Sequence, residues 1–372
     1  MAATLDSKSS PVRGAGSSPA RRILFMKSEV LLDRDVFRES VFKRDNNCCV
    51  ICGATGQLDA HHIMERRLWT EPSEAGGYFL DNGASLCPTH HIQAEETVLT
   101  PASIRERAGI KQTLLPAHLY RDQEYDKWGN PVLPNGTRLK GELFFDESVQ
   151  KILTQGGVIG LFIKYVKYPR TYHLPWSSPS SDDRMLNSVA GFVGKEVVVT
   201  EKLDGENTTL YNDYVHARSL EKASGADRAE VWRAWTQIAH EIPEGWRVCG
   251  ENLLIKHSIH YKQLRAYFQV FSIWNERNIC LSWDETWEWT QLLGLQTVPV
   301  LYRGEWDEEK VRSLYVPNRT PDPMEGYVVR NSGAFNYGAF RDNVAKFVRL
   351  NHVSTDSHWR HSRWEKNALW QE

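Results

Sequence analysis

The chain has 372 residues, of which 41% are hydrophobic and 25% are charged, and its formal net charge at pH 7 is −2. This length allows two domains, and the composition is that of an ordinary globular protein. The sequence has no apolar run long enough to span a membrane, and the small net charge excludes a protein that is basic over its whole surface, so any nucleic-acid-binding surface must be local.

Residues 1–30 are rich in Ser, Pro, Ala and Arg and are predicted to form a disordered tail. The apolar patch ILFM within them is too short for the core of a signal peptide, so we expect a cytoplasmic protein. Its cysteines cluster in the first quarter of the chain, which in that compartment favours metal binding over disulfides. The remaining two, Cys249 and Cys280, lie in apolar strand-like runs and are predicted to be buried thiols.

Two short Cys/His motifs predict a metal site in the first domain, residues 31–112. Cys49 and Cys52 are separated by two residues, as are Cys87 and His90. Each pair can direct two donor atoms at one ion, and four such donors suit a tetrahedral Zn²⁺. We therefore predict that these four residues form a closed structural zinc site.

Four further polar residues lie near these motifs, and a structural zinc site does not need them: His61, His62, Asn82 and His91. With them, residues 36–110 resemble the HNH (ββα-metal) nucleases. The resemblance implies that His62 is the general base, that Asn82 orients it, and that His61 and His91 bind a catalytic divalent metal. In such a site the metal neutralises charge on the scissile phosphate while a neutral imidazole takes a proton from water. With an unperturbed pKa of about 6.5, the imidazole would need little tuning.

The sequence departs from the HNH pattern at two positions. The second half of the zinc site ends in His90, where the family usually has Cys, and His61 stands where the family often has Asp. The alternative interpretation is therefore a zinc-stabilised module that binds nucleic acid without cutting it.

Residues 113–160 are dense in Pro, Gly and Asn and are predicted to be a connecting segment that ends in a short helix, DESVQKILTQ. The second domain, residues 161–350, opens on the apolar stretch LFIKYVKYP, which predicts a strand. Later the β-branched run GKEVVVT leads into EKLDGEN, residues 201–207. By itself EKLDGEN is also typical of a strand that ends in an Asp-Gly turn.

Charged side chains flank several predicted strands of this domain. The stretches EKLDGEN, VCGENLL, MEGYVVR and VAKFVRL contribute Lys202, Glu251, Glu325, Lys346 and Arg349. Together they supply a nucleophile, two acids and two cations. A lysine attacks only as a neutral amine, and at its reference pKa roughly one in a thousand is neutral near pH 7.

The two cations are therefore expected to lower the pKa of Lys202. They could also hold the phosphates of a nucleotide, while Glu325 offers a hard oxygen ligand to Mg²⁺ or Mn²⁺. The chain has no Walker-type glycine loop, so ordinary kinase or ATPase chemistry is not indicated.

In this order the motifs resemble those of the covalent nucleotidyltransferases, which are the polynucleotide ligases and capping enzymes, and the RNA ligase branch matches best. The resemblance covers about residues 161–350 and implies an α+β fold of antiparallel sheets flanked by helices. It implies that Lys202 accepts AMP, that Glu251 contacts the ribose and that Phe271 stacks on adenine. It further implies that Glu325 lies near the metal and that Lys346 touches the α-phosphate.

Three more residues are assigned to the nucleotide site by the same resemblance. Glu201 is the acid that precedes the lysine, and Arg218 corresponds to an arginine that contacts nucleotide or the RNA end. The last motif often carries a second Lys two residues after the first; that place is Val348 here, and Arg349 follows it. We therefore include Arg349 with a less defined role.

Residues 351–372 are expected to form a C-terminal tail that either covers a nucleic-acid strand or folds as a helix. They are too few for the OB domain of DNA ligases and capping enzymes, so we expect no C-terminal OB domain, which favours an RNA ligase.

The sequence thus predicts an ATP-dependent RNA ligase that joins 5′-phosphate and 3′-OH ends, fused to an HNH-like nuclease module. Its expected partners are RNA ends, and DNA at the HNH module remains open; no membrane partner is expected. One alternative is a DNA-targeting nuclease whose ligase-like domain senses nucleotide or RNA. Another is a nucleic-acid-binding protein in which both sites are inert. The sequence does not distinguish nicked from single-stranded substrates, and it leaves the oligomeric state open.

Overall fold

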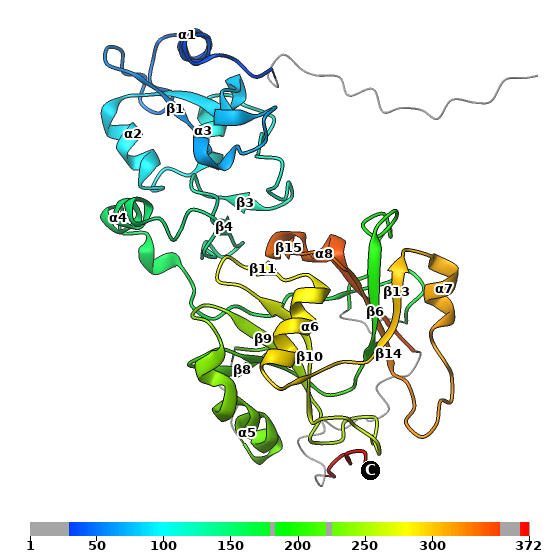
Figure 1. Cartoon of the computed structure of the whole chain (residues 1–372). Coiled ribbons are helices and arrows are strands. Elements are labelled where there is room, and N and C mark those ends of the chain that lie inside the picture. Colours follow the sequence, from blue (N-terminus) through cyan, green and yellow to red (C-terminus); the bar gives the residue numbers. More distant parts are fainter. Residues whose placement is uncertain (1–29, 179–182, 221–224, 350–364, 372) are drawn as a thin grey trace, which may run out of the picture.

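The computed structural model describes residues 30–178, 183–220, 225–349 and 365–371. The chain forms an N-terminal module, a connecting segment and a larger second domain built on two sheets (Figure 1). Of the predicted tail, residues 1–30, all but Val30 lie outside the described residues. Among the helices described, none has the length and apolar character needed to cross a membrane.

The N-terminal module has a hairpin followed directly by a helix, the ββα order. Its elements are α1 (Arg34–Arg44), β1 (Asp59–His62), β2 (Gly83–Leu86), α2 (Pro88–Glu95) and α3 (Pro101–Arg107). The strands pair antiparallel, from Asp59 opposite Leu86 to His62 opposite Gly83. A Cβ at Gly83 would overlap side chains of α1, so this glycine lets α1 pack directly on β2. The close packing gives the small module a buried core.

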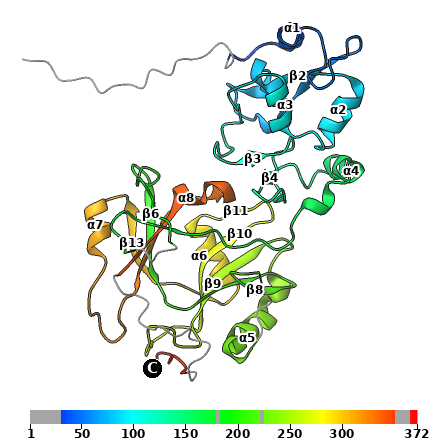
Figure 2. The ribbon, with the colours of Figure 1, turned by 180° about the vertical axis from the view of Figure 1, so that it is seen from behind.

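The connecting segment packs against both of its neighbours. It contains β3 (Glu124–Tyr125), β4 (Pro131–Val132) and α4 (Glu147–Gln155), so the predicted helix DESVQKILTQ is confirmed. Trp128 Nε1 donates a hydrogen bond to Glu95 O of α2, and Asn278 Nδ2 of the second domain donates one to Lys140 O. In both views β4 lies beside β11 (Ile279–Cys280), and residues of both line a hollow of about 350 Å³ (Figures 1 and 2).

Within the described residues, the first sheet of the second domain has five strands in the order β13-β6-β14-β16-β5. Their bounds are β5 (Tyr172–His173), β6 (Glu196–Lys202), β13 (Val300–Glu305), β14 (Gly326–Asn331) and β16 (Val344–Val348). The valines of β6 are fully buried because its two faces are covered and other strands pair on both sides. Contrary to expectation, the stretch LFIKYVKYP, residues 161–169, forms no strand and makes only an isolated bridge at Phe162, so the first strand of the domain is β5.

The second sheet has seven strands in the described part of the chain. Its path is β15-β11-β10-β9-β7-β8, with β12 added beside β10. Besides β11, the bounds are β7 (Glu206–Leu210), β8 (Val215–Ala217), β9 (Arg247–Asn252), β10 (Phe268–Trp274), β12 (Gln296–Thr297) and β15 (Phe335–Asn336). Pairing is antiparallel except for β10 with β12 here and β16 with β5 in the first sheet.

Helices accompany both sheets, and the mixed α+β architecture agrees with the predicted fold class. They are α5 (Ala229–Ile238), α6 (Trp283–Leu292), α7 (Glu308–Ser313) and α8 (Phe340–Asn343). Val231 and Ile238 of α5 join the core of the seven-stranded sheet, and Val311 of α7 joins that of the five-stranded sheet. Cys249 and Cys280 are buried thiols, as predicted.

Candidate active site

A cavity of about 300 Å³ lies between the two sheets of the second domain. The five-stranded sheet contributes the end of β6 and Lys346 of β16, and the seven-stranded sheet contributes residues of β7, β9 and β10. The cavity brings together most of the nucleotide-site residues predicted from the sequence, which are Glu201, Lys202, Arg218, Glu251, Phe271 and Lys346.

Lys202 is held against Glu325 by strand pairing. Lys202 ends β6 and lies opposite Gly326, the first residue of β14, so Glu325 is carried to the lysine by the antiparallel register. Lys202 Nζ donates a hydrogen bond of 2.6 Å to Glu325 Oε2. On its other side β14 pairs with β16, where a Cβ at Gly326 would overlap Phe347 O, so glycine permits the close approach of β14 to β16. The ion pair is therefore a product of sheet geometry.

The turn that follows Lys202 connects the two sheets. β6 ends at Lys202 and the chain bends at Asp204 and Gly205, as a strand followed by an Asp-Gly turn would, but β6 and β7 belong to different sheets. Gly205 N–H donates to Glu251 Oε1 at 3.1 Å, and a Cβ on Gly205 would overlap the backbone of β9. The glycine thus allows the turn to lie against β9, with Glu251 beside the lysine.

Carboxylates dominate the electrostatics of this lysine. Burial disfavours its charge, but Glu325 and Glu251 outweigh burial and raise the pKa of Lys202 above its ordinary value. Burial raises the pKa of Glu251 to about 8, and burial lowers the pKa of Lys346. The expectation that Lys346 and Arg349 lower the pKa of Lys202 is wrong for the protein by itself, because carboxylates are its strongest charged neighbours.

Phe271 and Arg218 enter the cavity from the seven-stranded sheet and the segment after β8. The pairing of β10 with β9 shifts register between Val270 and Ser272, so Phe271 lies in a β-bulge, a feature that redirects a side chain. Its ring makes an edge contact with Tyr168 at a centroid distance of 5.1 Å. Burial lowers the pKa of Arg218, with Arg170 adding to the effect.

Glu201 and Arg349 were both assigned to the nucleotide site, but the structure gives each of them contacts with other parts of the protein. Glu201 lines the cavity, but its carboxylate also accepts two hydrogen bonds from the Arg319 guanidinium, at 2.8 and 2.5 Å. Arg349 is outside the described lining of the cavity, and its backbone N–H donates to Glu325 O at 3.1 Å. Both residues help to fix the Lys202–Glu325 contact.

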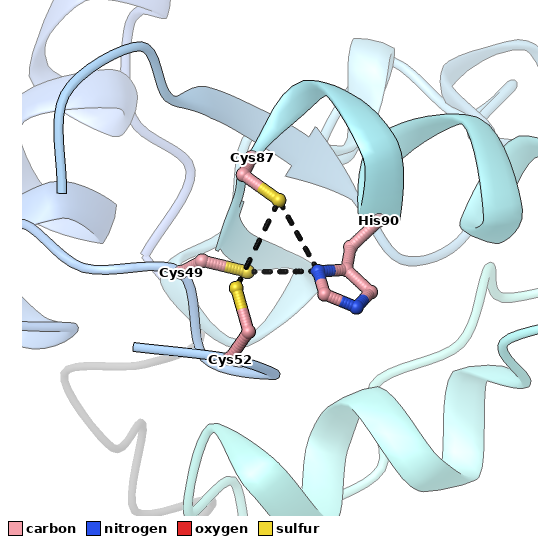
Figure 3. A group of neighbouring side chains, drawn as sticks. All are labelled: Cys49, Cys52, Cys87 and His90. Carbon is pink, nitrogen blue, oxygen red and sulfur yellow. Dashed lines mark hydrogen bonds between the residues drawn. The ribbon is translucent and has the colours of Figure 1, made fainter. Parts of the chain in front are cut away.

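The four predicted zinc ligands point toward one another in the N-terminal module (Figure 3). The donor atoms of Cys49, Cys52, Cys87 and His90 all lie within 4.8 Å of one another. Although burial would raise the pKa of Cys49, surrounding backbone N–H groups lower it to about 6, which favours the thiolate. These donors fit a tetrahedral Zn²⁺, which prefers thiolate and imidazole ligands.

A second group of possible metal ligands contains His61, His91 and Glu95. Glu95 Oε1 lies 3.4 Å from His61 Nδ1 and 3.5 Å from His91 Nε2. Lys127 of the connecting segment also reaches this group, with its Nζ 3.2 Å from Glu95 Oε1, and its side chain is only 3% exposed. Imidazole and carboxylate donors fit a divalent metal, and Lys127 adds a fixed positive charge beside them.

His62 lies in a different environment from His61. Its ring stacks on Phe37 at a centroid distance of 4.7 Å and meets Tyr78 edge-on, whereas His61 faces His91. Burial, followed by Lys127, lowers the pKa of His62 to about 3 and that of His61 likewise to about 3. The expectation of an imidazole near its unperturbed pKa is therefore wrong, because His61 is buried and His62 is partly buried, both near the cation Lys127.

The side chain of Asn82 joins the backbone of two neighbouring segments by hydrogen bonds. Its side-chain oxygen accepts from Met64 N–H at 2.8 Å, and its amide nitrogen donates to the carbonyls of Met64 and Gly77. Its own backbone carbonyl accepts from Ile63 N–H. Any influence of its amide on His62 therefore passes through the backbone of the segment that follows β1.

Residues 195–348 match the family model of RNA ligase. No curated protein matches the chain.

Several solved structures show partial similarity. A Naegleria gruberi RNA ligase variant with ATP and Mn has 18% identity and a TM-score of 0.34, over 51% of this chain and 62% of that one. An archaeal ATP-dependent RNA ligase has 15% identity and a TM-score of 0.35, over 50% and 48%. The Naegleria gruberi enzyme with PPi has 17% identity and a TM-score of 0.38, over 76% and 74%. The chain thus spans less than two thirds of the first two, and these TM-scores are too low to establish a shared fold.

Sequence reasoning missed several residues of both sites. In the cavity these include Asp183, whose carboxylate accepts from Lys346 Nζ at 3.2 Å, and Asn207 of β7. Asn207 lies in EKLDGEN and could have been found there, whereas Asp183 lies in a Ser-rich stretch with no signal. Glu95 stands four residues after His91, a spacing that places both on one helix face, but nothing marked Lys127.

The raised pKa of Lys202 leads to a direct chemical test. Only the neutral amine reacts with acetic anhydride, so at one pH Lys202 should be acetylated at least about tenfold more slowly than exposed Lys151. Replacing Glu325 by Gln removes a negative charge and should move half-maximal labelling of Lys202 to lower pH. Trace labelling over an alkaline pH series, read by mass spectrometry, measures both effects. Equal labelling of the two lysines in the parent would contradict the electrostatic picture.

Proposed function

We propose that the second domain is an ATP-dependent RNA ligase that joins 5′-phosphate and 3′-OH ends. The observation that carries this proposal is the contact of Lys202 with Glu325 at a cavity that also contains Glu251 and Lys346. The family match of residues 195–348 supports it. A lysine amine can act as a covalent nucleophile once it has lost its proton, and Lys202 contacts a carboxylate that can accept that proton.

In the proposed reaction Lys202 is the nucleophile. Its ammonium first loses a proton, which Glu325 Oε2 at 2.6 Å can accept, and burial assists by raising the pKa of Glu325. The neutral amine attacks the α-phosphorus of ATP, a nitrogen–phosphorus bond forms, and pyrophosphate leaves. The 5′-phosphate of RNA then attacks this phosphorus and displaces the lysine. Finally the 3′-OH attacks the activated 5′-phosphate and AMP leaves.

The neighbouring side chains would bind and orient the nucleotide. Lys346 would hold the α-phosphate, Glu251 the ribose and Phe271 the adenine face, while Arg218 would contact nucleotide or the RNA end. Mg²⁺ or Mn²⁺ at Glu325 would offset the charge of the triphosphate. Glu201, held by Arg319, would act through the position of the adjoining Lys202.

The first prediction of this proposal concerns the covalent adduct. Lys202→Ala should abolish label transferred from α-³²P ATP to protein, and Lys202→Arg should fail as well because a guanidinium stays protonated. Lys195→Ala is the matched control, since this exposed lysine lies just before the other end of β6 and should leave labelling unchanged. Label retained by Lys202→Ala would exclude the assigned nucleophile. A parent that cleaves DNA but neither takes label nor seals RNA would favour the nucleotide- or RNA-sensing alternative.

As a second function, we propose that the N-terminal module is a zinc-stabilised HNH-like nuclease. The observation favouring it is the group of His61, His91 and Glu95 beside the four zinc-type donors in a ββα unit. A divalent metal held there would neutralise charge on a scissile phosphate. His62 would be the base and Asn82 its support. The competing function is nucleic-acid binding without cleavage. Both RNA and DNA are to be tested as substrates.

Zinc content provides a prediction that does not depend on activity. We expect one tightly held Zn²⁺ per chain, measured by elemental analysis after chelator washing. Cys52→Ser should lose it, and hydrogen exchange should accelerate mainly within residues 36–110, because metal binding and local folding are coupled. Cys48→Ser should retain the ion, since Cys48 is outside the described donor group. Zinc retained by Cys52→Ser would refute the site.

The nuclease proposal predicts separable activities. His62→Ala removes the proposed base but no zinc-type donor, so cleavage of plasmid DNA or RNA should fall by ~10²–10⁴. Zinc content and RNA sealing should stay near the parental level. Exposed His240 provides the control, and His240→Ala should cleave normally. Unchanged cleavage by His62→Ala would exclude its role, whereas a parent that cuts none of the substrates would favour the binding module.

A further inference from the structure

Residues 365–371, at the C-terminal end of the described chain, lie against the second domain (Figure 1). Lys366 forms an antiparallel bridge with Ile255, and Leu369 forms a parallel bridge with Leu264. The helix considered for the C-terminal tail is therefore wrong for these residues, while residues 350–364 lie outside the described part. The segment adds extended backbone to the loop that follows β9.

Asn367 is the buried anchor of this segment. Its side chain is almost completely buried, its Oδ1 accepts from Tyr261 N–H at 2.8 Å, and its Nδ2 donates to Leu253 O at 2.8 Å. Its backbone N–H donates to Leu254 O, and its carbonyl accepts from Tyr267 Oη–H at 3.0 Å. One amide thus joins the two arms of the loop between β9 and β10.

Each arm leads to the turn after Lys202. On one arm, Asp204 N–H donates to Tyr261 Oη at 2.8 Å. The Asp204 carboxylate in turn accepts from the N–H groups of Ser258 and Ile259, at 2.7 and 2.8 Å. The Asp204 position is therefore fixed by the same loop that Asn367 closes.

The other arm leads back to β9. Leu253 and Leu254 follow Asn252, the last residue of β9, and Glu251 precedes it. Glu251 Oε1 accepts from Gly205 N–H, which continues the network to the residue after Asp204. Asn367 is thus linked to the lysine turn from two directions without touching the cavity.

We propose that Asn367 is a positioning residue for adenylylation: its amide fixes the loop of residues 253–261 and thereby the turn that presents Lys202 to ATP. The proposal rests on the ligase function given above. Without the amide, Tyr261 N–H and Leu253 O would lose buried partners, which favours rearrangement of the loop. Even a small misplacement of a nucleophile lowers its rate strongly, because attack requires aligned reacting atoms.

The test separates formation of the lysyl adduct from sealing of RNA. In Asn367→Ala, single-turnover formation of protein–AMP should fall at least about tenfold, with the ATP concentration for half-maximal rate changed less than about threefold. Sealing of chemically pre-adenylylated nicked RNA does not use the Lys202 amine and should change less than about threefold. Trp370→Ala, a change at an exposed side chain of the same segment, should match the parent in every assay.

Asn367→Asp keeps the acceptor for Tyr261 N–H but loses the donor to Leu253 O, so its adduct formation should fall between those of parent and Asn367→Ala. This graded recovery also serves if the alanine variant folds poorly. Parallel loss of adduct formation, pre-adenylylated sealing and thermal stability would overturn the positioning role and leave a purely structural one. Unchanged adduct formation in Asn367→Ala would also overturn it. A parent that forms no adduct would instead overturn the ligase function, and this proposal with it.

Discussion

The ion pair between Lys202 and Glu325 is the contact on which the second domain depends. Buried charges are costly unless paired, and this pair is supplied by the neighbouring strands β6 and β14, whose register places Lys202 opposite Gly326 and so next to Glu325. Glu251, from the opposite sheet, adds another carboxylate close to the lysine. Together the two carboxylates raise the pKa of Lys202 above its ordinary value.

The turn between Lys202 and β7 is held by contacts from several parts of the second domain. The chain must leave the five-stranded sheet at Lys202 and enter the seven-stranded sheet within a few residues. Gly205 makes the crossing sterically possible, and the side chain of Asp204 is held by backbone N–H groups of the loop after β9. Lys202 is thus positioned in part by the loop after β9, through Ser258 and Ile259, which are not among the residues that line the cavity.

The connecting segment contacts both the N-terminal module and the second domain. Lys127 is buried beside Glu95 in the N-terminal module, while Tyr120 Oη–H donates to Asp342 of the second domain at 2.7 Å. Asn278 adds a hydrogen bond to the backbone of the segment. Contacts on both sides limit independent motion of the module and the domain. The charge beside the histidine-rich group is therefore supplied from outside the ββα unit.

The sequence by itself determined the residue types of both sites and their order along the chain. Short spacings carried this information: two cysteine-containing pairs identify a donor set, and apolar runs identify strands that bear Lys202, Glu251 and Lys346. These patterns involve residues close together in the sequence, so they can be recognised without knowledge of the fold. For the same reason, they did not show that the Asp-Gly turn after Lys202 leads from one sheet to the other.

Only the tertiary structure decided which groups meet and how their charges act. The Glu325 contact comes from strand register, the direction of Phe271 from a β-bulge, and the buried position of Lys127 from packing of a distant segment. The pKa of Lys202 rises and that of His62 falls because burial and non-local neighbours set them. Such effects depend on distances between residues far apart in the chain, and no short sequence pattern encodes those distances.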